Sequence, residues 1–338
     1  MSRVLVTGAT GFVGGHLAAA FGDAEVTAVG RNRSRLRELQ SDGLQVDQID
    51  LGSPDAADRL SGHRPELIVH AAARSSPWGT AQEFQRANVD ATSAVLTAAT
   101  RAQAPVIYLS TPSVYMDRTN QLMVSEDDPL PSEFVNDYTA TKHQGEVLVR
   151  DFVADTGLPA AILRPQAIVG AGDTTLAPRF LKIIDRGIMP LFDGGTAVLD
   201  MTSVHNVVAA TELTAQSLIE GRLDDVTTLN VTNGEPRTVA SLFEMIVDIR
   251  SNKMPDARTP KRVSLPSGSC RTVAGLLEKL SLATGSWEPP LTQYSVDSLA
   301  YDRTLDISRA RETLGYTPEV HGIEEAIEGY FSHSQAML

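Results

Sequence analysis

Short apolar runs alternate with longer segments of helical periodicity through the first half of the 338-residue chain. Short apolar runs rich in β-branched residues are typical of buried strands, whereas apolar positions every three to four residues indicate amphipathic helices. Five strand-like runs, each followed by a helical segment, are RVLVTG, EVTAVG, LQVDQID, ELIVHAAA and PVIYLS. Strand and helix repeated in this order predict an α/β fold with a parallel, doubly wound sheet.

The second half of the chain loses this regular alternation. Two more strand candidates, AAILRPQAIVG and TTLNVTN, extend the predicted sheet, but the segments around them are rich in Pro and Gly. The chain also exceeds the ~250–300 residues at which one hydrophobic core stops growing. We therefore predict a first domain of residues 1–165 plus about 203–230, and a smaller, discontinuous C-terminal lobe of about 166–202 plus 231–338. Within that lobe, Ser251–Pro290 is expected to lie over the cleft.

Charge and cysteine content limit the classes of partner. The formal net charge of −13 repels phosphate backbones and anionic membranes, which argues against nucleic acid as a partner. The single cysteine, Cys270, cannot form an internal disulfide, and the first residues show no signal-peptide pattern. No apolar run approaches the roughly 20 residues that span a bilayer. We expect a cytoplasmic protein with no membrane span and no metal site, acting on a small molecule.

A glycine-rich loop follows the first strand and precedes an Ala-rich helix. Its glycines have the spacing Gly-x-x-Gly-x-x-Gly, which departs from the common dinucleotide pattern Gly-x-Gly-x-x-Gly. Glycines here allow a tight turn and a close approach of the backbone to a pyrophosphate, which the helix N-terminus attracts. The loop therefore predicts a Rossmann-type dinucleotide site in the first domain, and makes the C-terminal lobe the substrate-binding part. The residues expected to contact the cofactor are Gly8, Thr10, Gly11, Phe12, Val13 and Gly14.

The end of the second strand indicates which nicotinamide cofactor is used. An Asp or Glu there binds the ribose hydroxyls of NAD, but this chain has Gly30. Arg31 and Arg33 follow, where a 2′-phosphate would lie, and guanidinium groups suit phosphate. Arg35 and Arg37 are interpreted as a solvated turn of the next helix. NADP(H) is therefore favoured, with NAD(H) as the alternative.

A tyrosine and a lysine four residues apart form the candidate catalytic motif. Tyr138 and Lys142 fall on one face of a helix that Asn136 or Asp137 is expected to cap. Hydride transfer to a carbonyl needs a proton donor beside the new alkoxide, and an ordinary phenol titrates near pH ~10. Lys142 and an oxidised nicotinamide together would lower the pKa of Tyr138. The motif predicts Tyr138 as the acid/base.

The fifth strand ends in a hydroxyl-rich turn, Ser110–Tyr115, at the edge where parallel sheets bind ligands. The glycine loop, this turn, Tyr-x-x-x-Lys and Leu163–Pro165 occur in the order found in extended short-chain dehydrogenases/reductases. The chain thus resembles this group of the epimerase/dehydratase superfamily, and Asp306–Pro318 resembles its C-terminal segment. The resemblance implies Thr111 as the catalytic hydroxyl, with Ser110 as the alternative.

The resemblance also implies further cofactor contacts and an oligomeric state. Relatives hold the adenine, the cofactor body and the nicotinamide at positions that correspond here to Asp50, Leu51, Ala71, Ala72, Ala73, Asn88 and Pro165. Many form a homodimer through helices equivalent to Arg86–Arg101 and Tyr138–Phe152. We expect a homodimer on that ground alone.

Departures from the family pattern narrow the substrate class. Pro112 stands where dehydratases carry an acid, and Ala167 and Leu199 stand where sugar-nucleotide enzymes usually carry Asn and Arg. Losing these polar groups weakens diphosphate binding. The chain looks most similar to the 3β-hydroxysteroid dehydrogenase-like branch, which includes bacterial 2-alkyl-3-oxoalkanoate reductases. Candidate substrate contacts are Ser75, Trp78, Ser113 and Gln166.

Three functions are compatible with these motifs. The favoured one is an NADP(H)-dependent oxidoreductase that transfers a hydride between the nicotinamide and a ketone or secondary alcohol. A nucleotide-sugar 4-epimerase with tightly bound NAD would share the same catalytic residues. An NADPH-binding sensor or scaffold would usually have a broken catalytic set, and the set is complete here.

Overall fold

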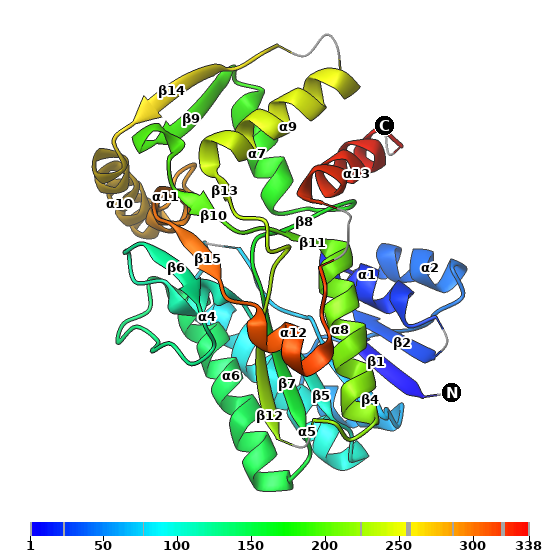
Figure 1. The fold of residues 1–338 in the computed structure, drawn as a ribbon. Helices are drawn as coiled ribbons and strands as arrows, with labels where there is room; N and C mark the ends of the chain where they lie inside the picture. The colour runs from blue at the N-terminus through cyan, green and yellow to red at the C-terminus, as the bar shows by residue number, and fades with distance from the viewer. Residues whose placement is uncertain are drawn as a thin grey trace.

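Parallel strands form the main sheet of the computed structural model (Figure 1). The structure describes residues 2–22, 24–76, 78–223, 225–254, 258–285, 287–318 and 322–336. Within these ranges the sheet has seven strands, in the spatial order β12 (Val226–Val231), β7 (Ala160–Pro165), β5 (Val106–Leu109), β4 (Leu67–His70), β1 (Arg3–Thr7), β2 (Glu25–Gly30) and β3 (Gln45–Gln48). Each of the seven strand-like runs contributes to it, so the predicted doubly wound α/β fold is confirmed.

Helices cover both faces of this sheet. Val4 and Val6 of β1 belong to one apolar core, whereas Leu5 between them belongs to another. Because side chains alternate along a strand, these are the cores on the two faces. The helices are α1 (Phe12–Ala20), α2 (Arg33–Ser41), α8 (Val204–Ile219) and α12 (Ser308–Leu314) on the first face, and α3 (Ala56–Gly62), α5 (Ala91–Ala102) and α6 (Asp137–Thr156) on the second.

One predicted strand is in fact two strands in different sheets. The run AAILRPQAIVG forms β7, which ends at Pro165, and β8 (Ile168–Val169), which pairs with β11 (Thr202–Ser203). Between them Ala167 takes a φ of +37°, which is uncommon for a residue other than glycine and turns the chain out of the main sheet. The prediction that the whole run extends the main sheet is therefore wrong.

A second group of elements stands at one end of the main sheet (Figure 1). It contains a four-stranded sheet and a further parallel pair, with the strands β13 (Arg237–Thr238), β10 (Val198–Leu199), β15 (Arg303–Leu305), β6 (Gln121–Val124), β9 (Ile188–Phe192) and β14 (Lys261–Leu265). Its helices are α7 (Leu176–Ile184), α9 (Val239–Lys253), α10 (Ser267–Thr284), α11 (Gln293–Ala300) and α13 (Ile323–Ala336). Although β6 comes early in the chain, it pairs with β15 of this group.

Four short helical segments complete the description: α4 (Ala81–Phe84), the π-helical η1 (Gln85–Asp90), and the 3-10 turns η2 (Pro112–Tyr115) and η3 (Asp193–Gly195). None of the helices that the structure describes combines the length and apolar character needed to cross a membrane.

Candidate active site

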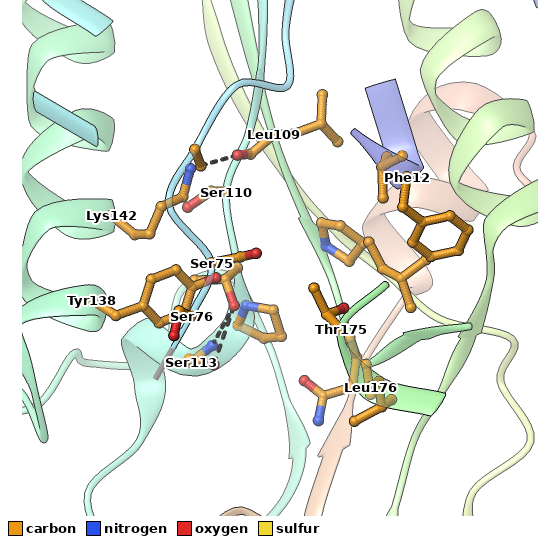
Figure 2. Close-up of a pocket in the computed structure, with 18 of the residues that line it drawn as sticks. Phe12, Ser75, Ser76, Leu109, Ser110, Ser113, Tyr138, Lys142, Thr175 and Leu176 are labelled. Atoms are coloured by element: carbon orange, nitrogen blue, oxygen red, sulfur yellow. Dashed lines mark hydrogen bonds between the residues drawn. The ribbon is translucent and has the colours of Figure 1, made fainter. Parts of the chain in front are cut away.

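A cavity of about 890 Å³ lies at the carboxyl ends of the main strands and continues into the second group of elements (Figure 2). It includes the gap between β1 and β4, where the strand order reverses and ligands bind in doubly wound sheets. The predicted site residues that line it are Gly8, Thr10, Gly11, Phe12, Val13, Gly14, Arg31, Asp50, Leu51, Ala71, Ala72, Ala73, Ser75, Thr111, Ser113, Tyr138, Lys142, Pro165 and Gln166. Residues predicted from separate motifs thus meet in one cavity.

The glycine loop has no room for side chains. Gly8 has a φ of +73°, and a Cβ there would lie 2.7 Å from the Cα of Ala72. A Cβ on Gly14 would lie 2.2 Å from the Gly8 carbonyl oxygen. The N-cap of α1 is Gly11, and no side chain caps it. Bare backbone at a helix N-terminus fits a pyrophosphate, so these residues suit a dinucleotide.

Beyond the loop, the structure separates the four arginines that follow the second strand, Arg31, Arg33, Arg35 and Arg37. Arg31 lines the cavity, but Arg33 is the first residue of α2 and lies outside the lining, and its contact with the cofactor stays a prediction. The helix starts there because the Asn32 side chain accepts hydrogen bonds from the first turn of α2. Gly30 is packed against Thr10, whose Cγ2 would lie 2.4 Å from an added Cβ. An acidic residue at position 30 therefore has no space in this arrangement.

Asn88 joins protein groups by hydrogen bonds and does not line the cavity, and its contact with the cofactor stays a prediction. Its Oδ1 accepts a hydrogen bond from the Arg74 backbone N–H at 2.7 Å, and its Nδ2 donates to Thr141 Oγ1 at 3.0 Å. Asn88 thereby fixes the loop after β4 against α6.

Trp78 also lies outside the cavity lining, and its role as a substrate contact stays a prediction. The Trp78 backbone N–H donates to Ser76 Oγ at 3.2 Å, and its carbonyl accepts from Arg74 Nη2 at 3.2 Å. These bonds close the loop on itself and leave Ser75 in the lining.

Thr111 and Tyr138 come together from different elements. Thr111 caps η2, and its hydroxyl donates to Ser113 Oγ at 3.1 Å. Tyr138 lies in the first turn of α6, which Asn136 caps, and the Thr111 side chain is close enough to the phenol to affect its pKa. The alternative hydroxyl, that of Ser110, donates to Glu146 Oε1 at 2.6 Å and is engaged there. The geometry favours Thr111 as the hydroxyl that acts with Tyr138.

The pKa of Tyr138 is shifted upward in this structure. Burial raises the pKa of its phenol above the ordinary value, Tyr294 adds to the shift, and Thr111 opposes it. In the protein alone Lys142 is not among the groups that shift the pKa of Tyr138, and its Nζ donates to the Leu109 carbonyl at 2.6 Å; the lowering expected with an oxidised nicotinamide bound stays a prediction. In the protein alone, Tyr138 is therefore a neutral phenol, which is the form that donates a proton.

Lys142 is almost fully buried behind the reacting groups. Its Nζ lies 4.0 Å from the ring centroid of Tyr108, and burial lowers the pKa of Lys142 to about 7 while Glu146 opposes the shift. Figure 2 shows Lys142 and Tyr138 on the same side of the cavity, opposite Phe12 and Thr175.

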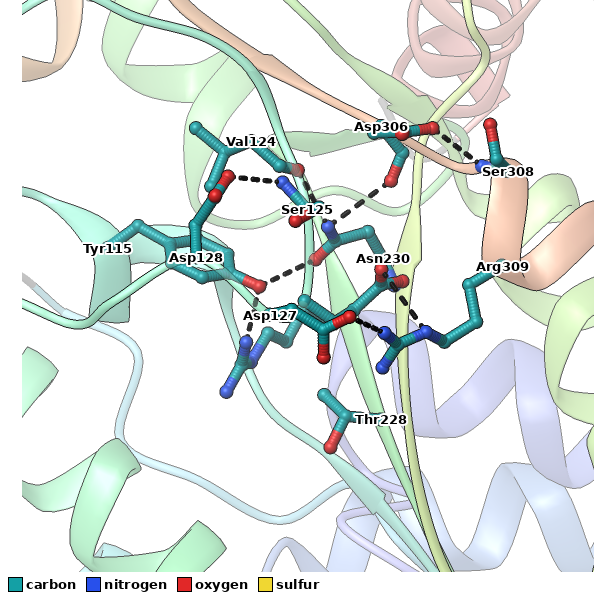
Figure 3. Close-up of polar contacts among 12 residues, drawn as sticks. Tyr115, Val124, Ser125, Asp127, Asp128, Thr228, Asn230, Asp306, Ser308 and Arg309 are labelled. Atoms are coloured by element: carbon teal, nitrogen blue, oxygen red, sulfur yellow. Dashed lines mark hydrogen bonds and ion pairs between the residues drawn. The ribbon is translucent and has the colours of Figure 1, made fainter.

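A buried polar network, which the sequence analysis did not identify, supports this side of the cavity. The Glu146 carboxylate accepts hydrogen bonds from Ser110 and from Arg164, whose Nε lies 2.8 Å from Oε1. Arg164 also donates to the Tyr115 hydroxyl, which donates to Asn230 Oδ1 at 3.2 Å. Figure 3 shows the Tyr115–Asn230 end of this network. Burial alone would raise the pKa of Glu146, but the Arg164 guanidinium outweighs burial and lowers it.

The end of the cavity away from the glycine loop is mostly apolar. Its apolar lining residues come from β10, α7, α9, α11 and the loop before β11, and are Leu176, Phe180, Ile183, Leu199, Met201, Val239, Leu242, Phe243, Ile246 and Leu299. Polar residues that sequence reasoning missed also line it, and these are Gln121, Thr174, Thr175, Arg179, Tyr294, Ser295, Ser298, Arg303 and Thr304. No sequence signal marks them, because none of them belongs to a motif.

The expectation for Ser251–Pro290 is corrected in the same region. None of the residues that the structure describes in this segment lines the cavity, and the lining comes instead from the following helix, α11. The reason is that β14 pairs with β9 and α10 packs on α11, which places the segment outside α11.

Comparisons with known proteins agree with this architecture. The model of the NAD dependent epimerase/dehydratase family matches residues 4–227. The chain is 33% identical over 335 residues to the uncharacterized protein YbjS of Escherichia coli (strain K12), covering 96% of each chain. It is 28% identical over 340 residues to the 2-alkyl-3-oxoalkanoate reductase of Stenotrophomonas maltophilia (strain K279a), covering 99% of this chain and 100% of that protein. Among solved structures, the UDP-glucuronic acid 4-epimerase of Bacillus cereus in complex with NAD superposes with a TM-score of 0.74 at 21% identity, covering 99% of each chain.

The fold and the cavity are those of an NAD(P)-dependent oxidoreductase of the short-chain dehydrogenase type, acting on CH–OH or C=O groups. The chain belongs to the NAD dependent epimerase/dehydratase family. The predicted resemblance is thereby confirmed, and the reductase among its relatives belongs to the branch expected from the motifs.

Proposed function

We propose that this protein is an NADP(H)-dependent reductase of apolar ketones, acting in reverse as a dehydrogenase of the corresponding secondary alcohols. One observation carries the proposal: a single cavity joins the glycine loop to an apolar end, and Thr111, Tyr138 and Lys142 also line it. Gly8, Gly11 and Gly14 would hold the pyrophosphate, and Arg31 the 2′-phosphate.

The side chains around Tyr138 suit carbonyl reduction. When bound, NADPH supplies the hydride that forms the new C–H bond at the carbonyl carbon. Tyr138 donates its proton to the carbonyl oxygen as the C=O π bond breaks, which gives the alcohol and leaves NADP⁺. The Thr111 hydroxyl stabilises the developing negative charge on that oxygen. Lys142 holds the Leu109 carbonyl and so fixes the end of β5 next to Thr111.

The apolar end favours a ketone over a nucleotide sugar. Ala167 and Leu199, which stand where sugar-nucleotide enzymes usually carry polar groups, both line the cavity. Leu199 packs among Met201, Leu242 and Phe243, and this apolar surface favours the alkyl part of a ketone. The similarity to a 2-alkyl-3-oxoalkanoate reductase supports the same substrate class.

Cofactor titration followed by a substrate panel tests the proposal. The purified protein is titrated with NADPH and with NADH, and NADPH oxidation is then followed with long-chain ketones, 3-oxoacyl compounds and 3-oxosteroids. We expect tighter binding of NADPH and turnover of apolar ketones. Protein that carries tightly bound NAD and epimerises a UDP-sugar without net oxidation would be the epimerase instead.

Arg31 provides a separate test of the cofactor preference. Replacing Arg31 with alanine removes the cation nearest the expected 2′-phosphate, so the Kd for NADPH should rise about tenfold and that for NADH should hardly change. Arg37→Ala is the matched control, because Arg37 is an exposed residue of α2 outside the cavity. Both constants can be measured by fluorescence titration. Equal losses for NADPH and NADH would remove Arg31 from 2′-phosphate recognition.

Residues 1–165 plus about 203–230 would form the dinucleotide-binding domain, and the remainder the substrate lobe. A homodimer through α5 and α6 and a cytoplasmic location stay predictions.

A further inference from the structure

Arg303 is a buried cation in the cavity wall whose hydrogen-bonding groups are only partly used. It lies on β15 and is 7% exposed. Its Nη1 donates to Gln121 Oε1 at 2.7 Å, and its Nη2 donates to the Asp297 backbone carbonyl at 3.4 Å. Its Nε has no hydrogen-bond partner among the described residues. The Nε is shielded from solvent, but each Nη carries two N–H groups and uses one in these bonds, so the guanidinium, which lines the cavity, keeps donors for an acceptor there.

The charge around Arg303 is also incompletely balanced. Asp297 is a buried carboxylate, and it pairs with Arg118 Nε at 3.6 Å and with Arg271 Nε at 3.5 Å. No carboxylate in the described part of the chain forms an ion pair with Arg303 itself. Three guanidinium groups, those of Arg118, Arg271 and Arg303, thus lie around the single buried carboxylate of Asp297, and two of them pair with it. This local excess of positive charge occurs in a protein whose net charge is −13. Burial lowers the pKa of Arg303, and Tyr294, Asp297, Asp117 and Tyr301 oppose that shift.

Arg303 lies close to the reacting groups. Its neighbour Tyr294 places its hydroxyl 2.9 Å from Ser113 Oγ, and the Tyr294 ring meets the Tyr138 ring edge-on with 6.4 Å between centroids. Tyr294, Ser113, Tyr138 and Arg303 all line the same cavity. A group bound to Arg303 would thus be a short distance from a carbonyl at Tyr138.

We propose that Arg303 binds a carboxylate of the substrate, so that the enzyme acts on apolar oxo acids and the corresponding hydroxy acids. The proposal rests on the proposed function and names its substrate class. The carboxylate would accept the remaining Nη N–H groups and balance the guanidinium charge, in the charge-assisted geometry that arginine favours. The alkyl part would pack on the apolar lining of α7 and α9.

Matched acid and ester substrates test this assignment. The kcat/KM values for 3-hydroxydecanoate and its methyl ester are measured with NADP⁺ for the wild type, Arg303→Gln and Arg303→Lys. We expect Arg303→Gln to lose about 10- to 100-fold on the acid and less than about threefold on the ester, with Arg303→Lys in between. Arg271→Gln is the control, because it removes a charge from the same cluster outside the cavity, and it should keep the wild-type ratio of acid to ester.

Ligand binding decides the question independently of turnover. The complex with NADP⁺ should bind decanoate more tightly than decanol, and Arg303→Gln should abolish that difference.

Equal losses on acid and ester would make Arg303 a structural residue and overturn the proposal. Inhibition by UDP but not by decanoate, relieved in Arg303→Gln, would assign the site to a diphosphate and also overturn it. A wild type that turns over no alcohol or ketone but still binds decanoate through Arg303 would contradict the proposed function, and with it the substrate class, and would leave Arg303 as a carboxylate-binding residue only.

Discussion

Replacing Tyr138 with phenylalanine is expected to lower kcat for ketone reduction by about 100- to 10,000-fold. The substitution removes the phenolic proton that Tyr138 donates to the carbonyl oxygen, while the ring keeps its contacts with Phe84 and Tyr294. The Kd for NADPH should therefore stay close to the wild-type value. Single-turnover kinetics with saturating NADPH separate the chemical step from cofactor binding.

Tyr294→Phe is the matched control for this experiment. Tyr294 lines the same cavity and its hydroxyl touches Ser113, but it has no contact with Thr111 among those described. We expect a loss of kcat below about tenfold, the size of one modest hydrogen bond. If Tyr138→Phe kept most of its activity and Tyr294→Phe lost it, Tyr294 would be the proton donor and the assignment of Tyr138 would be wrong.

Breaking the buried pair of Glu146 and Arg164 is expected to have the largest effect on stability. Replacing Arg164 with methionine leaves the Glu146 carboxylate buried with only Ser110 and the more distant Arg150 as partners. Removing one member of a buried ion pair typically costs about 3–5 kcal/mol, because an uncompensated charge remains. Urea unfolding followed by circular dichroism measures the loss in the free energy of unfolding.

The double variant Arg164→Met with Glu146→Met distinguishes the charge from the packing. Because apolar residues of similar volume often replace a buried pair without loss, it should recover most of the stability. A double variant as unstable as Arg164→Met would show that the cost comes from lost packing. A loss below about 1 kcal/mol in the single variant would contradict the assignment of Glu146 and Arg164 as a buried ion pair.

The sequence predicts the main sheet well because its strands are buried on both faces. Such strands read as short apolar runs, and each is followed by a helix of clear periodicity. The error at AAILRPQAIVG has a local cause: the apolar pattern continues through Gln166 and Ala167, and only the backbone turn at Ala167 divides it. The second group of elements is hard to predict because its strands are two to five residues long and pair across large separations in the chain.

The residues of the candidate site also differ in how far the sequence predicts them. The glycine loop and the Tyr138–Lys142 pair were found because each lies within a few neighbouring residues. Asn88 was placed at the cofactor from resemblance, whereas its hydrogen bonds to Arg74 and Thr141 depend on how the loop after β4 meets α6. Arg303 has no local motif, and the pairing of β15 with β6 and with β10 brings it to the cavity.

Transfer of a labelled hydride is the sharpest test of the proposed reduction of a ketone by NADPH with Tyr138 as the proton donor. NADPH carrying deuterium on the transferred position of the nicotinamide is incubated with the protein and a long-chain ketone, and the product is analysed by mass spectrometry. The account predicts deuterium at the carbinol carbon of the alcohol with the wild type, and none above background with Tyr138→Phe on the same time scale. An unlabelled product, or no alcohol with any ketone while a UDP-sugar is epimerised, would contradict it.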